Sequence, residues 1–186
     1  MYRTLYCNDI SESHVGQRVQ LAGWVDVIRD HGGVIFVDIR DYTGITQTVI
    51  HDEEMVKNVN RETVISVSGI VRKRDEDTVN TKIATGYVEL VVDELTVLGK
   101  SKNMLPFDVR GSRLIKDELR LKYRYLDLRN PKNHENLLMR SRIIRHLRNK
   151  MESKDFLEMQ TPILTASSPE GARDFLVPSR KHPGKF

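Results

Sequence analysis

Alternating apolar and polar residues between closely spaced turn signals fill the first half of the chain. Three runs have this period of two: Val19 to Arg29, Val34 to Arg40 and Ile45 to Ile50. They are separated by Gly32-Gly33 and by Thr43-Gly44. Successive side chains of a strand point to opposite faces of a sheet. The pattern therefore predicts a three-stranded meander in which each strand has one buried face.

Two more strand-like runs follow, Thr63 to Lys73 and Tyr87 to Leu98. A polar stretch from Asp52 to Asn60, compatible with a short helix, lies between the third and fourth runs. Five strands with a helix at that place are typical of the OB-fold, a five-stranded Greek-key barrel that often binds oligonucleotides on the face of strands two and three. We expect a mainly β domain of this kind at residues 1–103.

The pattern changes after the fifth run. Residues 99–116 contain glycine and proline with little periodicity and indicate a linker, which we place at 104–130 together with a short helix from Asp117 to Leu126. Asn130 followed by Pro131 is typical of a helix start, so a long helix should begin there. We expect a strand from Phe156 to Ile163 and a polar loop over 165–174. Residues 131–186 would then form the beginning of a second domain.

Charge is distributed unevenly along the chain. Residues 1–100 carry 11 Lys and Arg against 16 Asp and Glu, whereas residues 101–186 carry 19 against 10. Phosphate contacts need Lys and Arg, so any RNA recognition by the first half must depend on locally placed side chains. No apolar stretch approaches a membrane span, and the single cysteine, Cys7, is expected to be a buried apolar filler. We expect a cytoplasmic protein without a membrane partner.

Other chemistries have little support. The six histidines show no H-x-x-x-H pairing, so no metal site is expected, and no phosphate-binding glycine loop occurs. Ser167, Ser168 and Glu170 lie close in sequence, but the pattern places no histidine base beside them, which argues against a hydrolase triad.

Phe36 is the strongest candidate for contact with a nucleobase. Alternation puts Ile35 and Val37 on one face of the second strand and Phe36 on the other, polar face, where an aromatic ring can stack on a base. A core role for Phe36 on a barrel face covered by a loop is the alternative. On the fifth strand, pattern alone favours an exposed surface carboxylate for Glu89 over a group that reads a base edge. Periodicity does not settle the direction of Gln47.

Several stretches resemble bacterial aspartyl-tRNA synthetases, which are class II enzymes of subclass IIb. They are GWVDVIRDHGGVIFVDIRD (23–41), ATGYVE (84–89), LKYRYLDLR (121–129), FLEMQTPILT (156–165) and SPEGARDFLVPSR (168–180). The first fits subclass IIb generally, and the last two together are specific to the aspartate branch. The resemblance implies an OB-fold anticodon-binding domain followed by an α+β fragment of a class II catalytic domain.

The resemblance also implies roles for individual residues in binding the anticodon of tRNA-Asp. Phe36 would stack on the central uridine while Gln47 and Arg29 bond to it. The remaining positions matched to anticodon recognition are Arg72, Arg74, Asn80 and Glu89, and His31 in the turn before Phe36. Thr78 stands where family members have asparagine, which weakens the transfer of the contact with the third base. At His31 the chain resembles synthetases that also charge tRNA-Asn. We therefore hypothesise that the enzyme accepts both tRNA-Asp and tRNA-Asn.

In the second domain, residues 132–165 resemble motif 1 of the dimer interface, ending in Pro162, with Asp155 where glycine is usual. Glu170 would contact the substrate ammonium from the loop at 166–174. The family's other motifs, which hold ATP, Mg²⁺ and the aspartate side chain, are expected after Phe186. The chain alone is therefore predicted to be inactive, with no complete catalytic set and no bound cofactor. The full-length enzyme would be a homodimer that attaches aspartate to tRNA and has no DNA partner.

Two other classes of protein compete with this interpretation. A stand-alone OB-fold nucleic-acid-binding module would have no reason to continue into the motif 1 helix and the SPEGARD loop. A lysyl- or asparaginyl-type synthetase would share the barrel, but its loop would differ from the PEGARD run.

Overall fold

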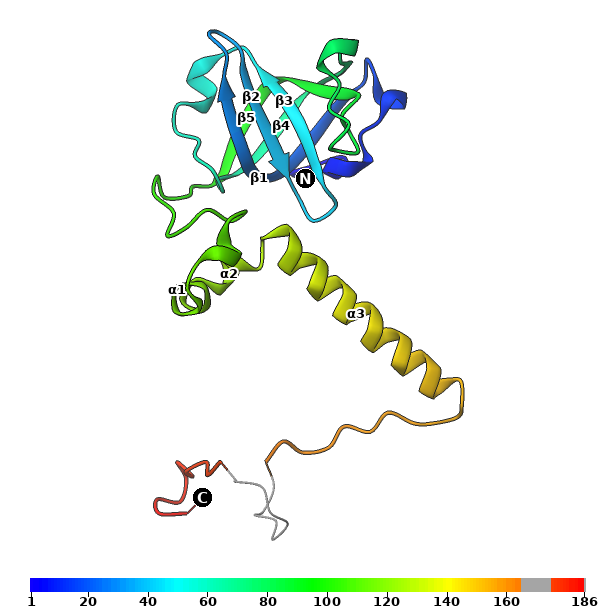
Figure 1. The fold of residues 1–186 in the computed structure, drawn as a ribbon, viewed down its shortest axis with the longest axis vertical. Helices are drawn as coiled ribbons and strands as arrows, with labels where there is room; N and C mark the ends of the chain where they lie inside the picture. Colours follow the sequence, from blue (N-terminus) through cyan, green and yellow to red (C-terminus); the bar gives the residue numbers. More distant parts are fainter. Residues whose placement is uncertain (165–174, 186) are drawn as a thin grey trace. The chain divides into compact units, whose positions relative to one another are not determined.

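The computed structural model describes residues 1–164 and 175–185. The chain forms two compact units, Met1–Asp108 and Val109–Phe186. The first is a β-barrel and the second contains the long helix (Figure 1). The domain limits predicted above remain a proposal.

Five strands close the barrel in the order β1-β2-β3-β5-β4. They are β1 (Arg18–Asp30), β2 (Ile35–Arg40), β3 (Ile45–Ile50), β4 (Val64–Lys73) and β5 (Val88–Gly99). Neighbours pair antiparallel, except that β3 and β5 are parallel. The predicted OB-fold is confirmed, and the ends of the five predicted strands differ by at most one residue.

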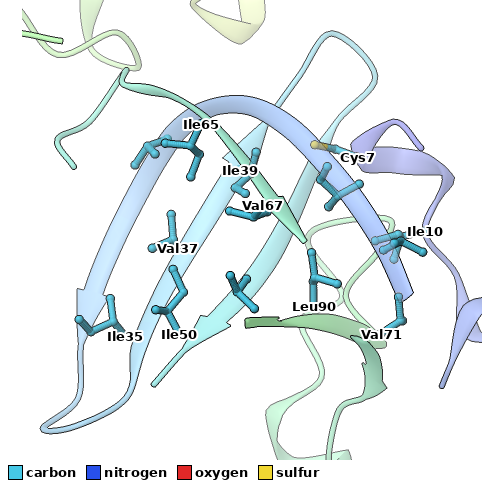
Figure 2. Close-up of a cluster of buried hydrophobic side chains, with 14 of the residues drawn as sticks. Cys7, Ile10, Ile35, Val37, Ile39, Ile50, Ile65, Val67, Val71 and Leu90 are labelled. Atoms are coloured by element: carbon cyan, nitrogen blue, oxygen red, sulfur yellow. The ribbon is translucent and has the colours of Figure 1, made fainter. Parts of the chain in front are cut away.

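The predicted alternation puts apolar side chains into the barrel. On β2, Ile35, Val37 and Ile39 are buried while the residues between them are only partly covered. Leu21, Ile65, Val67 and Leu90, among others, complete one hydrophobic core, whose side chains converge in the interior (Figure 2). Cys7 belongs to this core with no exposed surface, so its expected role as an apolar filler is confirmed.

Short 3₁₀ turns lie in the segment before β1 and in the connections β3–β4 and β4–β5. They are η1 (Cys7–Asp9), η2 (Glu12–His14), η3 (Glu53–Val56) and η4 (Glu76–Thr78). The helix expected between Asp52 and Asn60 is thus a single turn, which Asp52 caps by accepting a hydrogen bond from the backbone N–H of Glu54 at 3.0 Å. Between β1 and β2, Gly32 and Gly33 adopt φ values of 70° and 97°, which explains the glycine pair at this turn.

The second unit contains η5 (Ser112–Leu114), α1 (Asp117–Lys122), α2 (Arg124–Asp127) and α3 (Pro131–Glu152). The predicted long helix is confirmed at its start, because Asn130 caps it by accepting from the backbone N–H groups of Lys132 and Asn133. The amide of Asn130 also donates to the carbonyl oxygens of Val109 and Arg110, at 3.0 and 2.9 Å. The cap therefore ties the helix to the segment that precedes it.

The carboxylate of Asp127 organises the same segment although it is fully buried. It accepts hydrogen bonds from Ser112 at 2.8 Å, Asn133 at 2.9 Å and Arg120 at 3.1 Å, and it pairs with Arg124. Burial by itself would raise the pKa of Asp127, but the bonds from Arg120 and Ser112 and the nearby guanidinium charges outweigh it and hold the pKa below its usual range.

The strand predicted from Phe156 to Ile163 is wrong, because these residues form an exposed irregular segment after α3. A strand needs a neighbour for its backbone hydrogen bonds. In the described ranges all strands are paired within the barrel. Asp155, which stands where the resembled motif has glycine, adopts φ 63° and supplies the left-handed residue that ends the helix.

The loop at 165–174, including Glu170, lies outside the described residues. Over the part of the chain that is described, no helix is both long and apolar enough to cross a membrane.

Candidate nucleic-acid interface

A groove of about 570 Å³ opens on the barrel surface where β1, β3 and β4 end and where β2 and β5 begin. Seven of the eight residues assigned to anticodon recognition line it: Arg29, His31, Phe36, Gln47, Arg72, Arg74 and Glu89. They come from all five strands, from the turn between β1 and β2, and from the position just after β4, up to 60 positions apart in the chain. Barrel closure is therefore what brings them together. Val34, Val49, His51, Asp75 and Thr78 complete the lining.

Phe36 forms the aromatic part of the groove. It lies on β2 opposite Arg29 of β1 and Val49 of β3, with its side chain half-buried on the face that points away from the core. The ring of His31 meets the Phe36 ring at a centroid distance of 5.4 Å and an interplanar angle of 87°, an edge-to-face contact. The pattern-based placement of Phe36 outside the core face is confirmed.

A chain of hydrogen bonds crosses the floor of the groove. Arg29 binds both carboxylate oxygens of Asp38, at 2.7 and 2.8 Å, and donates a further bond to Gln47 Oε1 at 3.2 Å. Gln47 then donates from Nε2 to Glu89 Oε2 at 3.0 Å. Glu89 Oε1 accepts from Arg72 Nη2 at 2.6 Å. The bond to Asp38 raises the pKa of Arg29, so this guanidinium stays charged.

Glu89 is only 5% exposed, so the interpretation of an exposed surface carboxylate is wrong. β5 is paired on both sides, with β3 and with β4, and Arg72 lies opposite Glu89 in the register. Alternation along a single strand does not show which strands will lie on either side of it. Gln47, whose direction periodicity left open, is 6% exposed, and its amide is held between Arg29 and Glu89.

Arg74 is a buried cation with unused hydrogen-bond donors. Its side chain is 9% exposed, and its Nε lies 4.0 Å from Glu89 Oε2. Within the described part of the chain, neither Nε nor Nη1 has a hydrogen-bond partner. A buried donor without an acceptor costs about 1–3 kcal/mol, which is an unusual arrangement unless a ligand supplies the acceptor.

Asn80 is the assigned residue that does not line the groove. Its side-chain oxygen accepts from the backbone N–H of Lys82 at 3.1 Å and so shapes the loop between η4 and β5. Thr78, the position at which the chain departs from the family, does line it. Sequence reasoning did not assign His51 and Asp75 to the site; their only signal is their position just beyond the ends of β3 and β4.

The charges of the groove are nearly balanced, since three arginines face Asp75 and Glu89 in the lining and Asp38 behind it. Phosphate binding alone favours unpaired Lys and Arg. An aromatic ring beside amide, carboxylate and guanidinium groups is better suited to reading unstacked bases by stacking and by edge hydrogen bonds. Among the described residues no group of three His, Cys, Asp or Glu could hold a metal ion.

Family models match both parts of the chain. Residues 19–98 match the OB-fold nucleic acid binding domain described as tRNA anti-codon, and residues 116–186 match class II tRNA synthetases (D, K and N). The first range contains all the groove residues. The second contains α1, α2 and α3.

Curated relatives match over the whole chain. The aspartate–tRNA(Asp/Asn) ligase of Anaplasma phagocytophilum is 52% identical over 192 residues, that of Rickettsia prowazekii 51% over 190, and that of Chlorobium phaeovibrioides 50% over 190. The match covers 100% of this chain in each case. It covers 31–32% of the relatives, so the chain spans about a third of their length.

Solved structures show the same fold. Asparaginyl-tRNA synthetase from Pyrococcus horikoshii with asparaginyl-adenylate is 29% identical with a TM-score of 0.77, covering 92% of this chain and 39% of that one. Aspartyl tRNA synthetase from Entamoeba histolytica is 20% identical with a TM-score of 0.75, covering 87% and 40%. The identity near 50% to aspartate–tRNA ligases separates the chain from an asparaginyl-type enzyme, and the match at 116–186 separates it from a stand-alone barrel.

Proposed function

The chain belongs to the aspartate–tRNA ligase family, and from this we propose that its barrel recognises the anticodon of tRNA-Asp. The observation that carries the proposal is the convergence of Phe36, Gln47 and Arg29 in one groove, with the aromatic ring next to a fixed amide and a fixed guanidinium. These are the components needed to stack one unpaired base and bond to its edge.

The central anticodon base would stack on Phe36. Uracil presents carbonyl acceptors and an N–H donor on its pairing edge. Gln47 has one amide N–H and one oxygen lone pair left after its bonds to Glu89 and Arg29, and Arg29 has further N–H groups. A uridine can therefore satisfy these groups, whereas cytidine, with an amino group in place of one carbonyl, would place donor against donor.

The flanking bases would be read by Arg72, Arg74 and Glu89. Arg74 has unpaired donors that a base carbonyl would satisfy. Both oxygens of Glu89 already accept hydrogen bonds, from Arg72 and Gln47. A base with N–H donors would therefore use the remaining lone pairs or displace Arg72, whose side chain is 58% exposed. The role of Asn80 on this surface would be indirect, through the loop that follows Thr78.

The whole protein would activate aspartate with ATP and Mg²⁺ and transfer it to tRNA as a cytoplasmic homodimer. Glu170 would bind the substrate ammonium, and a carboxylate facing an ammonium is electrostatically favourable. Pro162, in the exposed segment after α3, would belong to the dimer interface. The chain by itself should not form aspartyl-adenylate; aspartate-dependent pyrophosphate exchange by the purified chain would overturn this.

Relatives named for both tRNA-Asp and tRNA-Asn support the hypothesis of relaxed specificity. We propose His31 as its determinant, because its ring contacts Phe36 in the groove. The ratio of tRNA-Asn to tRNA-Asp charging should fall in the full-length His31→Leu enzyme. An unchanged ratio would remove His31 from this role.

The anticodon assignment is tested by binding of this chain to a tRNA-Asp anticodon stem-loop and to one with the central uridine replaced. Phe36→Ala or the base replacement should weaken binding by about 1–3 kcal/mol. Tyr42→Ala is the matched control, because this exposed tyrosine lies in the turn between β2 and β3 and outside the groove. Equal, purely salt-dependent binding in all cases would refute the assignment.

A further inference from the structure

We propose that Asp38 is a positioning residue for base recognition, which sets Arg29 and, through Arg29, the orientation of the Gln47 amide. The inference rests on the proposed function of the groove. Asp38 is not among the residues that line the groove. It would therefore control specificity without touching the RNA.

Both carboxylate oxygens of Asp38 contact the same partner. They are occupied by the guanidinium nitrogens of Arg29, at 2.7 and 2.8 Å, and the side chain of Asp38 is only 14% exposed. Bidentate pairs of this kind fix the plane of the guanidinium as well as its position. Arg29 is 38% exposed on the groove side and would otherwise be free to turn toward the solvent or toward a phosphate.

The same pair fixes Gln47. Asp38 and Gln47 face each other across β2 and β3, and Arg29 Nη2 donates both to Asp38 and to Gln47 Oε1. At the other end of the amide, Nε2 donates to Glu89. Flipping the amide would put its oxygen against the carboxylate of Glu89 and its N–H groups against Arg29, so both contacts would become repulsive. The amide therefore has one favoured orientation.

This orientation decides which base edge fits. With the amide fixed, the free N–H and the free lone pair of Gln47 occupy defined places beside Phe36, and a base must present the complementary groups. If Asp38 no longer held Arg29, the amide would lose one of its two charged partners and could present either end. The unpaired guanidinium would also attract phosphate regardless of sequence. Loss of Asp38 should therefore weaken discrimination between bases and strengthen the salt-dependent binding of phosphate. Specific and non-specific binding would thus change in opposite directions.

The test compares wild type, Asp38→Asn and Asp93→Asn in this 186-residue chain. Asp93 forms the matched control, because it makes the same two-oxygen contact with Arg18 on the same barrel outside the groove. We expect Asp38→Asn to reduce the affinity ratio between the uridine and replaced-base stem-loops by about tenfold, the equivalent of one lost charged hydrogen bond. Asp93→Asn should leave the ratio unchanged.

Two further measurements distinguish positioning of Arg29 by Asp38 from a merely structural role of Asp38. In ¹⁵N-edited NMR of the free protein, the Arg29 side-chain N–H and the Gln47 amide signals should shift and exchange faster in Asp38→Asn. Arg29→Lys keeps the charge but cannot make the bidentate pair. If Asp38 acts through Arg29, the double variant should lose no more discrimination than Arg29→Lys alone. Asp38→Glu should partly restore the ratio, and this variant also covers the case in which Asp38→Asn does not fold.

The outcomes separate the two proposals. If wild type discriminates the central base and Asp38→Asn does so equally, or if the two single changes add fully in the double variant, the positioning role is refuted while the anticodon assignment stands. If wild type itself does not discriminate, the anticodon assignment fails, and this inference fails with it.

Discussion

Gln47 Nε2 donates a hydrogen bond to Glu89 Oε2 across 3.0 Å, joining two strands whose residues are 42 positions apart. This contact depends on the parallel pairing of β3 with β5, the step that closes the barrel. The same carboxylate binds Arg72 and lies near Arg74. Glu89 is thus the common counter-charge of the groove.

Replacing Glu89 by Gln should have two measurable effects. The free energy of unfolding should fall by about 1–3 kcal/mol, because Arg72 and Arg74 lose a buried partner. Binding to a stem-loop of unrelated sequence should become tighter at low salt and more steeply salt-dependent, since guanidinium charge is released toward phosphate. Chemical denaturation and titrations at several salt concentrations measure both effects.

The control for this change is Glu94→Gln on the same strand, whose side chain is 72% exposed and faces Arg18. It should change neither stability nor the salt dependence appreciably. An unchanged salt dependence in Glu89→Gln would show that the arginines are held by other contacts.

The carboxylate of Asp41 predicts an acid-sensitive attachment of the N-terminal segment. It accepts hydrogen bonds from the backbone N–H of Cys7 at 2.8 Å and from the hydroxyl and N–H of Thr43 at 2.6 and 2.7 Å. Burial alone would raise the pKa of Asp41, but these bonds outweigh it and lower the pKa from 3.8. The stabilisation is therefore present above pH 3.8 and is lost as the pH falls through the lower, folded-state value.

Asp41→Asn should consequently be less stable than wild type at pH 7 by about 1.5–3 kcal/mol. The difference in stability should shrink as the pH falls below the ordinary pKa of an aspartate, 3.8. Urea denaturation from about pH 2.5 to about pH 7 measures this difference. Asp77→Asn, on the exposed turn η4, is the control. A pH-independent difference would mean that the charge of Asp41 does not contribute.

The sequence was sufficient to predict structure wherever the determinant is local. Period-two alternation gave the β2 core face, and the Asn130-Pro131 pair gave the start of α3, because strand faces and helix caps depend on residues within a few positions. The incorrect prediction of a strand from Phe156 to Ile163 shows the limit of such local patterns. A strand also requires a hydrogen-bonded neighbour, which a local pattern does not reveal.

The site could be predicted less completely for the same reason. Phe36 could be placed on the outer face of β2 from alternation alone. The burial of Glu89 and the direction of Gln47 depend on which strands lie on either side, and that information comes from barrel closure. Asp38 lies two positions after Phe36 and so shares its face of β2, but the pairing of Asp38 with Arg29 requires the β1–β2 register.

Cys7 should be nearly inert toward thiol reagents in the folded protein. Its side chain is fully buried, and burial, followed by the charge of Asp41, raises the pKa of Cys7. Only the thiolate reacts, so alkylation by iodoacetamide at neutral pH should be at least about a hundredfold slower than in urea. Val15→Cys, which adds a thiol at an exposed position, should react rapidly at one site. Fast modification of Cys7 itself would indicate local opening of the N-terminal segment.

Gly69 should be one of the barrel's least replaceable positions. It lies on β4 at a shift in the β4–β5 register, and a Cβ there would be 1.9 Å from the carbonyl oxygen of Val91. Because that obstacle is backbone of the paired strand, Gly69→Ala should destabilise the protein by roughly 2–4 kcal/mol. Gly99→Ala at the end of β5 is the matched control, since its Cβ would meet only Val64 at an ordinary 3.8 Å. Thermal denaturation of both variants decides the point: similar melting temperatures would mean that the β4–β5 pair relaxes around the added methyl group.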